Sequence, residues 1–112
     1  MSGWYGFDLD GTLARDDENL LDGEIGSPIP DMVRFVKKLH GHGQEVRILT
    51  ARAAHMDEKE ARRLRAWLFE VLGFIPRITA SKDKDMKVLY DDRAIGIVPN
   101  EGRRADRKRL DV

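Results

Sequence analysis

The segment FDLDGTLA, residues 7–14, places two aspartates one residue apart, directly after an apolar run and directly before a glycine. Side chains two apart on a strand point to the same side, so Asp8 and Asp10 share a face while Leu9 turns away. Two like charges at this distance repel each other and add nothing to a hydrophobic core. The pair therefore predicts the end of a strand at which another group must offset the charge of the two carboxylates.

Composition limits the classes of protein that fit the chain. A length of 112 residues predicts one domain, residues 1–112. The hydrophobic fraction of 41% and the charged fraction of 36% are typical of a soluble globular protein. Basic and acidic residues number 20 each, so the net charge favours no class of partner. Without cysteine there is no disulfide framework, and no apolar run approaches the ~20 residues of a membrane span, so we expect a cytoplasmic protein and no membrane partner.

Strand-like and helix-like segments alternate along the chain, which predicts an α/β fold. Two amphipathic helices are expected, one from Asp31 as N-cap to the HGHG stretch at 40–43, and one from Asp57 to Gly73. The intervening segment 14–30 is rich in Asp, Gly and Pro and is expected to be a loop. The predicted strands cover residues 4–9, 45–51, 76–80, 87–92 and 94–98.

This alternation predicts a single doubly wound, Rossmann-like domain. Its sheet is expected to be five-stranded and mainly parallel, with the first strand central and helices on both faces. The intervals from Asp10 to Thr50 and from Thr50 to Lys82 are filled by these elements, which leaves no room for a cap domain. The cleft is therefore expected to be open to solvent.

Acidic residues follow two of the predicted strands. Asp8 and Asp10 end the first strand, Thr50 ends the second, and Asp91 with Asp92 ends the fourth. In open parallel sheets, ligands bind beyond the carboxyl ends of the strands. Four carboxylates at one sheet edge would repel strongly unless a cation lay among them, and an all-oxygen site with open positions suits Mg²⁺.

The blocks DLDGT, ILTAR, a later lysine and YDDR, in this order, resemble the haloacid dehalogenase (HAD) superfamily of phosphohydrolases over nearly the whole chain. The pattern is most similar to small phage and bacterial members without a cap domain. It also resembles the 3′-phosphatase domain of polynucleotide kinases. The matched positions are Gly26, Pro28 to Met32, Thr50 to Arg52, Lys82, Asp83, Met86, Tyr90 to Ala94, Val98, Asn100 and Gly102.

The resemblance implies a phosphatase that acts through an aspartyl-phosphate. Asp8 would be the nucleophile, and Asp10 would protonate the leaving oxygen and then activate water. Thr50 would donate a hydrogen bond to a phosphoryl oxygen, and Lys82 would offset the developing charge. The metal ligands would be Asp8, the main-chain carbonyl of Asp10, and Asp91 or Asp92. The remaining substrate contacts would come from Gly11, Ala51, Arg52 and Arg93.

Other interpretations compete with these roles. An EF-hand loop requires its glycine at position six, whereas Gly11 stands at position four. A phospho-acceptor receiver domain uses similar residues in a different order, and a catalytically silent binding module with this fold is a further alternative. Lys84 and Lys87 lie near Lys82 and compete with it for the role of the catalytic lysine.

The substrate class stays open between two alternatives. The basic tail, residues 101–112, carries five cations that could follow a phosphate backbone, which favours a nucleotide or a phosphorylated nucleic-acid end. Three acidic residues in the same tail, Glu101, Asp106 and Asp111, are typical of a solvated terminus instead. An open cleft is equally consistent with a small phosphoester or with another macromolecule.

Overall fold

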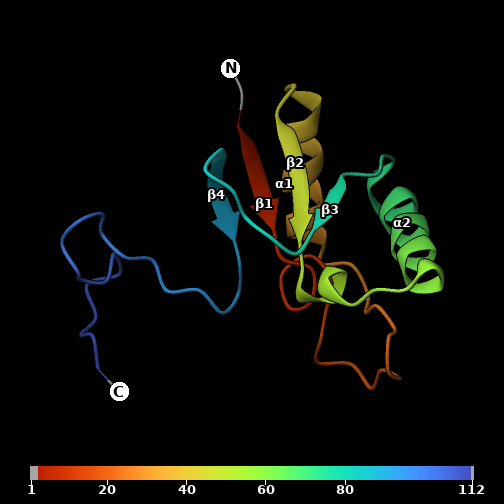
Figure 1. Cartoon of the computed structure of the whole chain (residues 1–112), viewed down its shortest axis with the longest axis horizontal. Helices are drawn as coiled ribbons and strands as arrows, with labels where there is room; N and C mark the ends of the chain where they lie inside the picture. Colours follow the sequence, from red (N-terminus) through yellow and green to blue (C-terminus); the bar gives the residue numbers. More distant parts are fainter. Residues whose placement is uncertain (1–2, 112) are drawn as a thin grey trace.

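The computed structural model describes residues 3–111 and has an α/β fold around a four-stranded parallel sheet (Figure 1). The strands are β1 (Trp4–Phe7), β2 (Glu45–Leu49), β3 (Arg77–Thr79) and β4 (Met86–Tyr90), in the order β3-β2-β1-β4. Strand β1 pairs with both β2 and β4 and lies inside the sheet. The predictions of an α/β fold, of a parallel sheet and of an interior first strand are confirmed.

Two α-helices and one short 3-10 helix connect the strands: α1 (Pro30–Gly41), η1 (Ala51–Ala54) and α2 (Glu58–Leu72). The predicted ends of α2 are confirmed, because Asp57 accepts a hydrogen bond from the Glu60 amide and Gly73 has a left-handed φ of 85°. The predicted N-cap of α1 is wrong. Proline is favoured at the first helical position, so α1 begins at Pro30 and Asp31 lies in its first turn.

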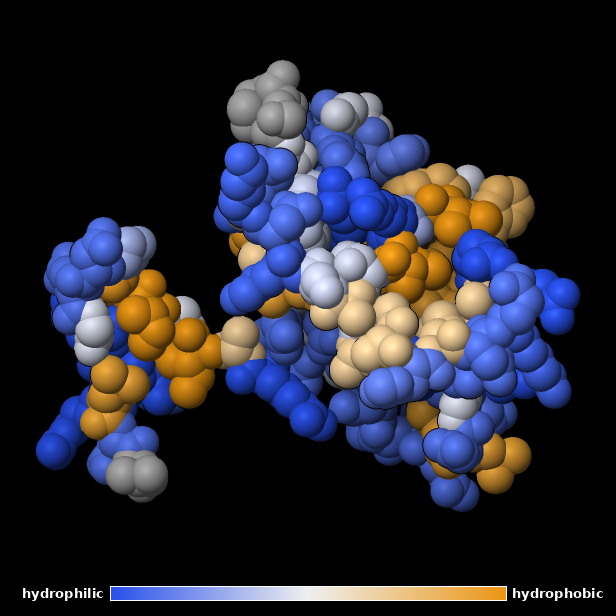
Figure 2. All heavy atoms as spheres, viewed as in Figure 1, coloured by the Kyte–Doolittle hydropathy of each residue, from blue (hydrophilic) through white to orange (hydrophobic). Residues whose placement is uncertain are grey.

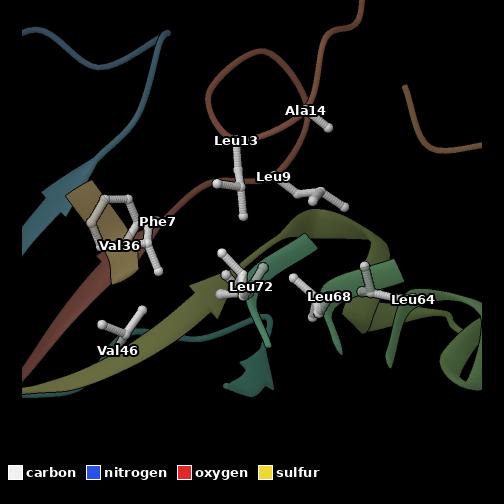
Figure 3. Close-up of a cluster of buried hydrophobic side chains, with 10 residues drawn as sticks. Phe7, Leu9, Leu13, Ala14, Val36, Val46, Leu64, Leu68 and Leu72 are labelled. Carbon is white, nitrogen blue, oxygen red and sulfur yellow. The ribbon is translucent and has the colours of Figure 1, made fainter. Parts of the chain in front are cut away.

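The hydrophobic core lies between the sheet and the two α-helices (Figure 3). Alternate residues of the central strands, including Phe7, Val46 and Ile48, pack against apolar side chains of α1 and α2. The two helices also contact each other. Two successive right-handed crossovers that progress in one direction place both helices on one face of the sheet. Among residues 3–111, the expectation of helices on both faces is therefore wrong.

A tryptophan and a short loop cover the opposite face of the sheet. Trp4 is fully buried, and its ring lies so close to Gly6 that a Cβ there would be 2.9 Å away. The indole nitrogen of Trp4 donates a 2.9 Å hydrogen bond to Asp83, in the loop between β3 and β4. The guanidinium of Arg47 lies 4.6 Å from the centre of the indole ring. These contacts bind the loop across the face that a helix was predicted to cover.

The fifth predicted strand does not join the sheet, which is a correction to the five-strand prediction. Residues 94–98 instead form one arm of a small hairpin, in which Ile97 pairs with Arg104. The Val98 amide donates to the Arg103 carbonyl, and the Ala105 amide donates to the Gly96 carbonyl. The Arg93 amide bonds to the Asp91 side chain in a turn that directs the chain away from β4. The alternating apolar pattern is satisfied equally by a hairpin arm and by a sheet strand.

The long connections hold no further folded unit among the described residues. A loop and α1 lie between β1 and β2, and η1 with α2 lies between β2 and β3. None of the helices in residues 3–111 is long and apolar enough to cross a membrane.

Candidate functional site

A cleft of about 590 Å³ lies at the carboxyl ends of the strands. Eight of the predicted site residues line it: Asp8, Asp10, Thr50, Ala51, Arg52, Lys82, Asp91 and Arg93. They follow all four strands, so parallel pairing alone brings them to one edge. Gly11 and Asp92, the two other predicted residues, line an adjoining hollow together with Asp91. The cleft also contains Asp16, which was not a predicted site residue because it lies in a loop without any motif.

Three carboxylates form an acidic cluster beside the cleft. Oxygens of Asp8, Asp91 and Asp92 all lie within 4.8 Å of one another. Small side-chain rotations would bring such oxygens to the ~2.1 Å ligand distance of one Mg²⁺, and carboxylate oxygens are the donors that this ion prefers. The residues present therefore fit the predicted metal. The carboxylate of Asp10 is not part of this cluster, and a contribution of its main-chain carbonyl stays a prediction.

Gly11 and Thr12, which directly follow Asp10 in the chain, fix the position of Asp92. The buried hydroxyl of Thr12 donates a 3.1 Å hydrogen bond to the Asp92 carboxylate and accepts one of 3.0 Å from the Asp92 amide. Gly11 has a φ of 90°, and a Cβ at this position would lie 2.5 Å from an Asp92 oxygen. Thr12 was not among the predicted site residues, although its hydroxyl directly follows the DxDG turn and is a plausible partner for a nearby acid.

Asp8 and Asp92 share a hydrogen bond, and the pKa of Asp8 is raised whereas the pKa of Asp92 is lowered. Partial burial, the hydrogen bond with Asp92 and the charge of Asp91 together raise the pKa of Asp8 from 3.8 to about 7. Burial also opposes ionisation of Asp92, but hydrogen bonds from Asp8 and Thr12 outweigh it and lower the pKa of Asp92. Without a metal, the pair thus holds one proton on Asp8 over much of the acidic range.

Asp10 is paired with Arg52 rather than with the acidic cluster. The Nε and Nη2 atoms of Arg52 each donate a 2.8 Å hydrogen bond to the Asp10 carboxylate, a bidentate pair. The same guanidinium donates to the carbonyls of Gly23 and Glu24, at 3.0 Å and 2.7 Å. Arg52 therefore joins Asp10 to the loop between β1 and α1, a contact that no motif in the sequence predicted.

The remaining predicted residues lie around the mouth of the cleft. Thr50 is 3% exposed, and its hydroxyl accepts a hydrogen bond from the Arg52 amide, so the hydroxyl keeps its own hydrogen as a donor. Lys82 is an exposed residue of the cleft lining. Lys84 and Lys87 do not line the cleft, and the ammonium of Lys87 lies 5.4 Å from the Tyr5 ring. This arrangement favours Lys82 over the two other lysines.

We expect Gly11→Ala to lower both the free energy of unfolding and the affinity for divalent cations. The new Cβ would displace the Asp92 carboxylate and force a left-handed φ on alanine, at a combined cost of about 1–3 kcal/mol. Gly23→Ala is the matched control, because Gly23 also has a positive φ, 82°, with its nearest side-chain neighbour 3.9 Å away. Urea unfolding with and without Mg²⁺ measures both quantities. Equal loss of Mg²⁺ stabilisation in the two variants would contradict this role of Gly11.

The raised pKa of Asp8 predicts a pH dependence of stability in the absence of divalent cations. The folded protein keeps a proton on Asp8 up to about pH 7, whereas the unfolded chain releases it near pH 3.8. This contribution to the free energy of unfolding is therefore complete below the lower value and disappears as the pH rises through about 7. Urea titrations in EDTA at several pH values should show the decline, and Asp8→Asn should flatten it. An identical slope in Asp8→Asn would show that Asp8 is not the group responsible.

Comparisons with known proteins bear on the fold. No family model and no curated protein matches this chain. Among solved structures it is similar to a conserved protein from Bacteroides thetaiotaomicron, with a TM-score of 0.60 and 18% sequence identity, covering 89% of this chain and 84% of that chain. At this identity the likeness extends to the α/β fold and not to a function.

Proposed function

We propose that this chain is a Mg²⁺-dependent phosphomonoester hydrolase of the HAD type. The observation that carries the proposal is the cleft in which Asp8, Asp10, Thr50 and Lys82 meet beside the cluster of Asp8, Asp91 and Asp92. A nucleophilic carboxylate, a second carboxylate for proton transfer, a hydroxyl donor, a lysine and an oxygen-ligand set are the groups that phosphoryl transfer requires. The fold that we propose with this function is a Rossmann-like sheet reduced to four strands, with both α-helices on one face.

The proposed reaction has two steps at one carboxylate. Asp8 attacks phosphorus, and the ester oxygen leaves with a proton from Asp10, which gives an aspartyl-phosphate on Asp8 and a free alcohol. Asp10 then takes a proton from water as the water attacks, which releases phosphate and regenerates Asp8. Mg²⁺ held by Asp8, Asp91 and Asp92 would neutralise phosphate charge. Thr50 and Lys82 would bind the phosphoryl oxygens.

Arg52 has a positioning role in this proposal. Its bidentate pair with Asp10 orients this carboxylate in the free protein, and its bonds to Gly23 and Glu24 hold the neighbouring loop. One hydrogen bond of the pair must be released before Asp10 can carry the proton that it transfers. A phosphate contact for Arg52, as the resemblance implies, would exchange one of these partners for the substrate. Arg93, in the turn after the acid pair, lines the same cleft and could contact a phosphate without such an exchange.

Asp8→Asn should abolish turnover of a chromogenic phosphomonoester in Mg²⁺, by about three orders of magnitude or more, because an amide cannot act as the nucleophilic carboxylate. Asp10→Asn should lower kcat severely as well. The matched control is Asp85→Asn, a change at an exposed acid outside the cleft lining, which should keep the wild-type rate. Retention of that rate in Asp8→Asn would disprove the mechanism.

The same assay separates the enzyme from its two alternatives. A phosphatase releases alcohol continuously, a receiver-like acceptor releases at most one equivalent, and a silent binding module releases none. Continuous Mg²⁺-dependent release is the result expected here.

A small phosphomonoester is the substrate class that we propose. The nucleic-acid alternative depends on the cations of the C-terminal tail, and two of them are already paired inside the tail, Arg103 with Glu101 and Arg104 with Asp106. These pairs reduce the charge available to a phosphate backbone.

We therefore expect kcat/KM for a small phosphomonoester to equal or exceed that for a 3′-phosphorylated oligonucleotide, with the same weak dependence on salt. Initial rates for both substrates at two salt concentrations measure this. If the value for the oligonucleotide is larger and falls steeply with salt, and if reversing the charges of Arg103 and Arg104 weakens it further, the substrate is a nucleic-acid end.

A further inference from the structure

The C-terminal lobe, residues 94–111, projects from the rest of the protein. It follows β4 and extends away from the sheet (Figure 1). The radius of gyration is 15.1 Å, whereas a compact chain of this length has about 13 Å. The backbone hydrogen bonds described for residues 94–110 join this segment to itself, for example between Val98 and Arg103. The lobe is thus held to the protein mainly by the chain that leads into it.

The lobe exposes apolar side chains that need a covering surface. Ile95, Ile97 and Leu110 are 52%, 48% and 64% exposed. Figure 2 shows apolar residues gathered over this segment, to the left of the main body. A two-stranded hairpin is at best marginally stable in water by itself. An apolar face on such a hairpin therefore indicates a partner surface.

Charge restricts the choice of that surface. The lobe carries five basic and three acidic side chains, so two lobes facing each other would repel. The loop of residues 15–25 has the opposite balance, with five acidic side chains and one basic. Attraction between opposite charges therefore favours a contact between a lobe and this loop.

The same loop borders a groove lined by both apolar and charged side chains. The groove has a volume of about 440 Å³ and is lined by Leu21, Asp22, Glu24, Ile25, Arg63 and Trp67. Leu21 at its edge is 76% exposed, the largest exposed fraction among the large hydrophobic side chains of the described residues. Two carboxylates and one guanidinium surround apolar side chains here, which complements the basic and apolar lobe.

We propose that the C-terminal lobe of one chain docks into the groove beside Leu21 of a second copy, and that the exchange is reciprocal. Reciprocal exchange forms a closed dimer with two identical contacts, the usual symmetry of small homo-oligomers. It buries Ile95, Ile97 and Leu110 against Leu21, Ile25 and Trp67, and it places the basic end of the lobe near Asp22 and Glu24. The proposal is independent of the phosphatase activity.

Sedimentation velocity of the full chain over a concentration series tests the proposal. We expect a monomer–dimer equilibrium that weakens as salt rises. Asp22→Lys or Arg109→Glu alone should raise the dimer dissociation constant by about tenfold, and the double variant should restore it, since the swapped charges attract again. Lys37→Glu is the matched control, a reversal at an exposed cation of α1 outside both surfaces, and should leave the constant unchanged. A monomer at every concentration, an open-ended series of larger species, or single reversals without effect would overturn the proposal.

Zero-length cross-linking distinguishes exchange between chains from folding of the lobe onto its own chain. A mixture of ¹⁴N- and ¹⁵N-labelled protein is treated with a carbodiimide, which joins lysine to carboxylate. Mixed-isotope peptides that link Lys108 to Asp22 or Glu24 are expected. Links of these residues within one chain alone would overturn the exchange.

Discussion

The parallel pairing of β1 with β4 is the constraint on which the site depends. Phe7 and Tyr90 are partners in the register, and their rings stack with centroids 4.8 Å apart. The Asp8 amide continues the pairing with a 3.0 Å hydrogen bond to the Tyr90 carbonyl. Because Phe7 and Tyr90 lie side by side at the ends of their strands, the residues that follow them emerge from the sheet next to each other. Asp8 is thereby placed beside Asp91 and Asp92. Strand pairing and aromatic packing thus provide the free energy that holds three carboxylates together.

Repulsion between these carboxylates is relieved by a shared proton, a hydroxyl group and a glycine. A proton shared between Asp8 and Asp92 removes one charge, and the Thr12 hydroxyl donates to another oxygen. Gly11 leaves the space that the Asp92 carboxylate occupies. A divalent cation at this cluster would take the place of the shared proton, because both bind the same oxygens. Metal affinity and the protonation of Asp8 are therefore linked, which is typical of carboxylates held at a functional site.

Local patterns in the sequence predicted the parts of the fold that depend on local chemistry. Apolar runs located β1 to β4, and Asp57 and Gly73 located the ends of α2. The acids at the strand ends followed from topology alone, since parallel strands present their carboxyl ends together. Long-range contacts could not be predicted in this way. The ring of Trp4 packs against Gly6, donates a hydrogen bond to Asp83 and covers one face of the sheet. No periodic pattern in the sequence predicts this contact.

The pairing of Asp10 with Arg52 could not be predicted from the sequence either, because it is also a long-range contact. The residues lie 42 positions apart, and the sequence shows each of them beside a different motif. Likewise, the pattern of Ile95 and Ile97 fits a sheet strand and a hairpin arm equally well. The turn at Asp91–Arg93, which decides between them, depends on a hydrogen bond from an amide to a side chain. Sequence patterns thus located the candidate site, whereas the partners of its side chains required the structure.

The balance of charge in the cleft determines the order of events that the proposed function requires. Four carboxylates line it, those of Asp8, Asp10, Asp16 and Asp91, against three cations. One of these cations, Arg52, is already neutralised by Asp10. Once Asp8 has released its proton, as attack on phosphorus requires, a phosphate monoester would meet excess negative charge at this point, and Lys82 and Arg93 at the mouth offset only part of it. Because attraction in such a cleft depends on the sum of its charges, neutralisation of the acidic cluster has to precede productive binding of the phosphate.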